Sequence, residues 1–362
     1  MDKVNLLDIC NPKQWKTLAT SELIADGKYD VYGANGIIGK YDDYNHEKST
    51  VLITCRGATC GNVHLSKPFS YINGNAMSLD NLDESRCLKE YLYYYLKGID
   101  LSNSISGSAQ PQITIQGLKK INVSLYDIKQ QRQIVNILSK IENLITYKKD
   151  EIEKANQLIK SQFVEMFEKY ENYNIMPLSK CTSFIDYRGH TPKVDEVGSI
   201  RMVNAKSVGK GYFKYINEFI TEDLYNVWMH RGFAHPGDIL FVTEGHTFGN
   251  SCLVPDDLIK FALGQRVITI QGNENIINNK YLSSYMQTKN FYNKINMYKT
   301  GGTAQGIRSK DLLKIEVPVP PIELQNRFAS IVEQIDKQKF EFEKSLKKLE
   351  ELQASLMQEY FG

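Results

Sequence analysis

The sequence has no long apolar segment and no marked excess of charge of either sign. No part of its 362 residues approaches the roughly 18 consecutive apolar residues of a membrane helix, and its start, MDKVNLLDICNPK, lacks a secretory signal pattern. Basic residues exceed acidic ones by only 44 − 42 = 2. We therefore expect a cytoplasmic chain without a membrane segment, in which any nucleic-acid surface arises from local clusters of charge.

Cysteine is sparse, and no two cysteines form a Cys-x-x-Cys pair, which argues against a zinc knuckle or a redox motif. The six residues are predicted to be reduced and mostly buried. The composition, 42% hydrophobic and 24% charged, is that of a globular protein with two or three buried cores.

Signatures of enzymes are also missing. The sequence contains no phosphate-binding loop, no His-Glu-x-x-His motif, no Gly-x-Ser-x-Gly motif and no methyltransferase or nuclease signature. Its histidines have no metal-ligand spacing, and we expect them on the surface or in loops. These histidines are His46, His64, His190, His230, His235 and His246. The sequence therefore predicts neither a cofactor nor a metal in this chain.

What the sequence does contain is an internal repeat, at a separation near 322 − 128 = 194 residues. A glycine loop follows an apolar, β-rich run at Arg56–Asn62 and again at Glu244–Asn250. A Gly-Ser/Thr-Ala-Gln segment follows at Gly107–Gln110 and at Gly302–Gln305, each ahead of a short alternating strand. The repeated order predicts two similar globular domains of mixed α+β structure in tandem.

A third marker, Ile-x-x-Gln-x-x-Ile/Phe, occurs at 128–134 and 322–328, and each copy opens a segment without glycine or proline. A strict heptad in these segments has 16 apolar residues at 20 positions, which predicts two long coiled-coil helices that pack antiparallel, with the halves related by a pseudo-two-fold. A polar position of this seam, Lys148, is expected at a helix end or toward solvent. Apart from Ala155 and Tyr360, the expected apolar seam residues are Ile134, Leu138, Ile141, Ile145, Ile152, Ile159, Met166, Phe328, Val332, Ile335, Phe342, Leu346, Leu349 and Leu356.

The markers divide the chain into four segments. We predict globular domains at residues 1–127 and 169–321, each followed by one of the long helices, at 128–168 and 322–362.

Basic side chains interleave with amides and aromatic residues in Lys48–Leu79, Tyr187–Lys214 and Lys299–Lys310. Lysine and arginine can neutralise phosphates or bind guanine, and asparagine and glutamine can bind adenine. Because a solvated loop has the same composition, a purely structural role stays open for each residue. The candidate DNA-binding residues are Arg56, Asn62, Lys67, Asn75, Arg188, Lys193, Arg201, Asn204, Lys206, Lys210, His246, Asn250, Arg266, Gln305 and Arg308.

Together, the duplicated helix motif, the glycine loops and the sequence PVPPIELQ at Pro318–Gln325 resemble the specificity subunit of type I restriction-modification systems. The resemblance extends over essentially the whole chain, although the first copy, SLYDIKQQ at Ser124–Gln131, lacks the prolines. It implies a non-catalytic subunit whose two target recognition domains each contact one half of an asymmetric, interrupted DNA site. The glycine-loop regions differ, Arg56 against Glu244 and Asn75 against Gln265, which fits domains that read different bases.

The resemblance also implies partners. The helix pair would act as a ruler and would dock two modification subunits, which bind S-adenosylmethionine and methylate adenine. Separate restriction subunits would use ATP and Mg²⁺ to translocate and cleave double-stranded DNA. Two other interpretations remain at this point: a coiled-coil scaffold without DNA specificity, and an enzyme with an unrecognised motif.

Overall fold

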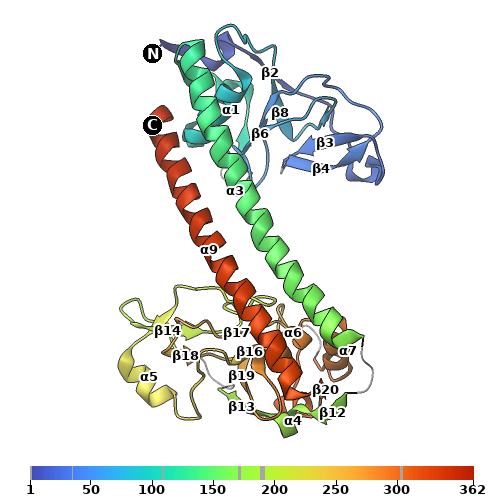
Figure 1. Ribbon diagram of the computed structural model, residues 1–362. Helices are drawn as coiled ribbons and strands as arrows, with labels where there is room; N and C mark the ends of the chain where they lie inside the picture. The colour runs from blue at the N-terminus through green and yellow to red at the C-terminus, as the bar shows by residue number, and fades with distance from the viewer. Residues whose placement is uncertain (1, 35, 108–109, 170–172, 188–191, 302–304) are drawn as a thin grey trace. The chain divides into compact units, whose positions relative to one another are not determined.

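A computed structural model describes residues 2–34, 36–107, 110–169, 173–187, 192–301 and 305–362. The chain forms two compact units of mixed helices and strands. Unit 1 comprises residues 1–150 and 342–362, and unit 2 comprises residues 151–341. Each unit thus contains parts of both long helices, α3 (Ile128–Phe163) and α9 (Ile322–Phe361), which are green and red in Figure 1. No helix in the described residues is long and apolar enough to cross a membrane.

The remaining elements of unit 1 are β1 (Asp2–Asn5), η1 (Leu6–Asp8), β2 (Asn11–Gln14), η2 (Thr20–Glu22), β3 (Tyr29–Gly33), β4 (Gly36–Tyr41), β5 (Val51–Thr54), β6 (Val63–Leu65), β7 (Tyr71–Ile72), β8 (Ala76–Asp80), α1 (Lys89–Gly98), η3 (Ser102–Ser104), β9 (Ile105–Ser106), β10 (Gln112–Ile113), α2 (Ile115–Leu118) and β11 (Asn122–Leu125). Those of unit 2 are η4 (Val164–Glu168), β12 (Asn174–Pro177), α4 (Leu178–Cys181), β13 (Thr182–Asp186), β14 (Ile200–Val203), β15 (Phe219–Ile220), α5 (Glu222–Trp228), β16 (Ile239–Val242), β17 (Ser251–Leu253), β18 (Phe261–Leu263), β19 (Val267–Gly272), α6 (Asn279–Met286), α7 (Lys289–Met297), α8 (Ser309–Leu312) and β20 (Glu316–Val319).

Apart from the short antiparallel pair β9-β10 of unit 1, the strands of the two units have the same topology. Unit 1 has a four-stranded antiparallel sheet, β2-β8-β5-β6, and a three-stranded sheet, β4-β3-β7, in which β3 and β7 run parallel. Unit 2 has the sheets β13-β19-β16-β17 and β15-β14-β18, in which β14 and β18 run parallel. A two-stranded sheet, β1-β11 or β12-β20, precedes each long helix. The sequence repeat is therefore also a structural repeat.

The central strands β5 and β16 are continuous apolar runs because both of their faces are buried. In β5, Val51 and Ile53 join the core that includes α1 and α3, whereas Leu52 joins the core on the opposite face. In β16, Ile239 and Phe241 pack in the core with α6 and α9 in the same way. Alternate residues of a strand point to opposite faces, so each central strand connects two cores.

The 14 expected seam residues, which lie in α3 and α9 and, for Met166, in η4, are all removed from solvent to some degree. Seven of them are buried, namely Ile134, Leu138, Ile141, Ile145, Phe328, Val332 and Ile335, and the other seven are half-buried. Within unit 1, Nζ of Lys149 lies 3.1 Å from Oε1 of Glu350, and Nζ of Lys148 lies 4.8 Å from the centre of the Phe342 ring. Lys148, which we expected at a helix end or toward solvent, is thus half-buried over an aromatic face.

The glutamine of the repeated helix motif anchors each long helix to its own unit. In unit 1, the Gln131 side chain accepts a hydrogen bond from the backbone N–H of Leu88 (2.8 Å) and donates to the carbonyls of Arg86 and Tyr126 (both 2.8 Å). Gln325 makes the same three bonds in unit 2, from Asn278 (2.9 Å) and to Ile276 (3.1 Å) and Pro320 (2.7 Å). Both side chains are fully buried. The glutamine therefore fixes the start of the long helix to the N-terminus of α1 or α6.

An aromatic cluster anchors the end of the other long helix in each unit. In unit 1, the ring of Phe361 lies 5.6 Å from that of Tyr91 and 5.5 Å from that of Tyr95. In unit 2, the ring of Phe167, which follows α3, lies 4.7 Å from that of Tyr281. Both phenylalanines are buried. Within each unit, the start of one long helix and the end of the other thus belong to one core.

Candidate nucleic-acid interface

The glycine loop of unit 2 forms an exposed corner, which we call corner 2 and define by Glu244, Arg266 and Gln305. The backbone N–H of Thr243 donates to the Arg266 carbonyl at 2.9 Å, and the N–H of Gly245 donates to the Gln305 carbonyl at 3.0 Å. Nε of Arg266 lies 2.9 Å from Oε1 of Glu244, and both side chains are about half exposed. Three residues distant in the sequence thus converge beside one loop.

Two glycines give corner 2 its shape. Gly245 has a φ of +95°, which disfavours other residues. A Cβ on Gly306 would lie 2.7 Å from Cβ of Glu244 and would collide with it. The absence of a side chain at position 306 therefore lets the backbone of Thr243 and Glu244 approach this closely.

Unit 1 has the equivalent corner 1, defined by Arg56, Asn75 and Gln112. The N–H of Cys55 donates to the Asn75 carbonyl at 3.0 Å, and Arg56 forms a β-bridge with Gln112, as Glu244 does with Gly306. Arg56 and Gln112 are exposed, and Asn75 is half-buried. Position by position, Arg56 corresponds to Glu244 and Gln112 to Gly306.

The corners correct one sequence comparison and add one residue. Asn75 corresponds to Arg266 rather than to Gln265, because unit 2 has one more residue between Gly264 and its strand than unit 1 has after Gly74. Gln112 was not among the candidates. Its place opposite Arg56 depends on a bridge between segments far apart in the sequence, which composition alone does not reveal.

Other candidate residues make contacts inside their own unit. Arg201 donates to the Ile216 carbonyl, and its guanidinium carbon lies 5.4 Å from the centre of the Tyr215 ring and 4.8 Å from that of Phe219. Asn204 and Lys206 both bind Glu218, at 2.6 Å each. The hydrogen bond from Lys206 is the main cause that lowers the pKa of Glu218. These contacts give the three residues a role in holding β14 to the following loop.

Two more candidates also have partners within their unit. The Asn250 amide donates to the Val208 carbonyl at 3.3 Å, so it links the glycine loop to a neighbouring segment. Nζ of Lys67 pairs with Asp30 at 2.8 Å, and this hydrogen bond raises the pKa of the lysine.

The remaining candidates are exposed at separate places. Asn62 and His246 lie in the glycine loops, Lys193 and Lys210 lie between strands, and Arg308 directly precedes α8. Arg188 lies outside the described residues, as does His190. The structure therefore brings together only a subset of the candidates, at the two corners.

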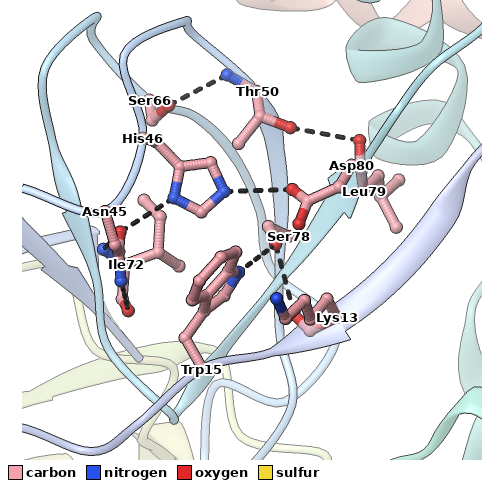
Figure 2. Close-up of polar contacts among 10 residues, drawn as sticks. All are labelled: Lys13, Trp15, Asn45, His46, Thr50, Ser66, Ile72, Ser78, Leu79 and Asp80. Atoms are coloured by element: carbon pink, nitrogen blue, oxygen red, sulfur yellow. Dashed lines mark hydrogen bonds and ion pairs between the residues drawn. The ribbon is translucent and has the colours of Figure 1, made fainter.

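Of the described histidines, His64 differs from the expectation of surface or loop positions because it lies in a strand, whereas His46 lies in the loop between β4 and β5 but is not at the surface. The side chain of His46 is largely buried, and its ring nitrogens lie 2.8 Å from Oδ1 of Asn45 and 3.0 Å from Oδ1 of Asp80, as Figure 2 shows. Its ring also packs edge-on against Trp15, with centroids 4.9 Å apart. His64 is half-buried in strand β6.

The His46 cluster lowers the pKa of Asp80. Burial alone would raise the pKa of Asp80, but hydrogen bonds from His46 and Ser78 and nearby positive charge outweigh it and hold that pKa below its usual value. Asp80 ends β8, the strand that begins next to Asn75 of corner 1. The cluster therefore stabilises the far end of that strand and is not part of the corner.

Comparisons with known proteins agree with this architecture. The sequence model of the type I restriction modification DNA specificity domain matches residues 1–157 and 188–354. A Haemophilus influenzae protein whose name gives it provisionally as a type I restriction enzyme specificity subunit is 23% identical over 87% of this chain and 82% of its own. The MjaVIII specificity subunit of Methanocaldococcus jannaschii is 22% identical, over 88% of this chain and 82% of its own.

Solved structures give the same result for the fold. The crystal structure of the type I restriction-modification S subunit from M. genitalium has a TM-score of 0.66 with this chain at 19% identity, and covers 98% of this chain and 94% of its own. Both units carry a match to the family, and the match extends over most of the chain. The chain belongs to the type I restriction-modification DNA specificity family, whose members are the non-catalytic subunits that recognise DNA.

Proposed function

We propose that the chain reads an asymmetric, bipartite DNA site, one half with each globular unit, and that corners 1 and 2 carry base contacts. The pair of corners is the observation that carries this proposal. The two corners share their backbone hydrogen bonding but have different polar side chains. Arginine suits guanine, and amides such as Asn75 and Gln112 suit adenine. The candidates with partners inside their units, such as Arg201 and Asn204, would instead support the reading surface.

The partners follow from the family and from the helices. Exposed apolar side chains lie on α3 and α9 away from the seam, at Ile137, Leu144, Tyr147, Phe340 and Leu352. Of these, Ile137, Leu144 and Tyr147 are spaced seven and three residues apart, so they lie on one face of α3, and apolar residues gathered on one face suit docking of a partner protein. We assign these helix faces to two modification subunits and the coiled-coil pair to a ruler between the half-sites.

The chemistry would reside in those partners. The modification subunits would bind S-adenosylmethionine, and restriction subunits would use ATP and Mg²⁺. The chain itself would need no cofactor. Its DNA target and its partners would place it in the cytoplasm. A scaffold without DNA specificity would not need two reading corners with different side chains.

A domain exchange tests the proposal. Replacing residues 170–320 with the matching domain of a relative, in the complete complex, should change one half of the methylated site and leave the other unchanged. Inserting four residues into one helix, about 6 Å of rise, should lengthen the unread spacer and keep both half-sites. Methylation mapping on genomic DNA measures both results. A change in both half-sites after the exchange would contradict the proposal.

A further inference from the structure

The backbone of Arg266 has a positive φ, which is unusual for a residue with a long side chain. Its φ is +71°, in the left-handed region that arginine seldom adopts and that glycine or asparagine would adopt at lower cost. The Arg266 carbonyl accepts hydrogen bonds from the N–H and the hydroxyl of Thr243, at 2.9 and 3.2 Å, which hold this conformation. The strained backbone thus directs an exposed, charged side chain to corner 2.

The ion pair with Glu244 fixes the guanidinium but leaves its binding edge open. Glu244 accepts from Nε of Arg266, and neither Nη atom has a partner among the described residues. A half-exposed ion pair contributes little to folding, so stability does not explain the arrangement. The two Nη groups offer the parallel donors that fit O6 and N7 of guanine in the major groove.

The carboxylate also argues against a phosphate contact. Glu244 places a negative charge 2.9 Å from the guanidinium, and that charge would repel a DNA phosphate approaching the same side chain. The edge of a base carries no net charge and is not repelled in this way. The electrostatics of corner 2 therefore favour base reading over backbone binding.

We propose that Arg266 reads a guanine in the half-site of unit 2 and that Glu244 is the positioning residue that orients its guanidinium. The inference rests on the proposed function. Corner 1 has no carboxylate at either equivalent position, because Arg56 stands in the place of Glu244 and Asn75 in the place of Arg266. Corner 1 therefore reads its half-site with a different arrangement of donors and serves as an internal comparison.

The test uses the complex of this chain with its modification subunits, on duplexes with the methylated site and every single-base variant of it. Arg266→Gly is the main variant, because glycine tolerates the positive φ and the fold should persist. We expect a loss of affinity of about 10- to 100-fold for the cognate duplex, and loss of discrimination at one G·C pair of one half-site. 7-Deazaguanine at that position should reproduce the loss for the wild type only.

Three further variants separate reading from other roles. Arg266→Lys should not restore discrimination, because lysine lacks the paired donors. Glu244→Gln should keep overall affinity and reduce selectivity at the same base pair. Arg56→Ala, the matched control, should affect only the other half-site.

Two results have different meanings. If Arg266→Gly weakens binding to all duplexes equally and reduces the salt dependence of binding, Arg266 contacts phosphate and the inference is wrong. If the wild-type complex itself shows no preference among the duplexes, the proposed function fails before Arg266 is tested.

Discussion

Units 1 and 2 share their buried polar and aromatic framework but differ at their exposed corners. Gln131 and Gln325 make the same three hydrogen bonds, whereas Arg56 is replaced by Glu244 at the equivalent corner position. A buried group without its partner is costly, and so the framework positions have little freedom to vary. An exposed side chain on a fixed loop costs little to exchange. The residues that stabilise each unit are thus different from the exposed residues at its corner.

The largest effect should come from the phenylalanines at the helix ends. Phe361→Ala and Phe167→Ala each remove a buried ring, which we expect to cost about 3–5 kcal/mol. Hydrogen exchange should show that Phe361→Ala loosens α1, at the other end of the sequence, while Phe167→Ala loosens α6. Loosening of α6 by Phe361→Ala would contradict the assignment of the C-terminal helix end to unit 1.

The buried glutamines should come next. Gln131→Leu and Gln325→Leu leave one N–H and two carbonyls without their partner, at an expected cost of about 2–4 kcal/mol. The two variants should lower the free energy of unfolding by similar amounts, each in its own unit. Denaturant unfolding measures the loss, and hydrogen exchange shows in which unit it occurs. Gln130→Leu, at an exposed neighbouring position, is the control and should change stability by less than about 0.5 kcal/mol. Equal effects of Gln130→Leu and Gln131→Leu would refute the anchoring role.

A smaller effect should depend on pH and involve unit 1. The folded-state pKa of Asp80 is lowered, so its contribution to stability is present above the unfolded pKa and is lost as the pH falls through the folded value. Acid should therefore weaken the end of β8 through protonation of Asp80. Asp80→Asn should cost about 1–2 kcal/mol at neutral pH and should reduce the acid dependence of unfolding. An acid profile unchanged by the substitution would exclude this contribution.

The smallest effect on stability is expected at corner 1. Arg56→Ala should change the free energy of unfolding by no more than about 0.5 kcal/mol, although it should alter DNA reading. Thermal unfolding of the free chain measures the first quantity. A large loss of stability would show that Arg56 belongs to the framework after all.

The sequence predicts features that depend on local pattern and repetition. The heptads locate both long helices, and the repeated motif singles out Gln131 and Gln325 without revealing their hydrogen bonds. Contacts between segments that are far apart in the sequence could not be predicted from these patterns. The rings that hold Arg201 and the bridge from Arg56 to Gln112 depend on the tertiary fold. The sequence comparison paired Asn75 with Gln265 instead of Arg266, because the loop of unit 2 has one extra residue. The strand register reveals this extra residue, and the sequence alone does not.

The division of the helices between units has a consequence for the order in which the chain folds during synthesis. Unit 2 is one continuous segment, residues 151–341, whereas unit 1 needs residues 342–362 to complete its core. Domains generally fold as their residues emerge from the ribosome. Unit 2 can therefore close its core first, although it is made second. Until Phe361 emerges, Tyr91 and Tyr95 lack the ring that packs against both of them, so the core of the nascent unit 1 is incomplete.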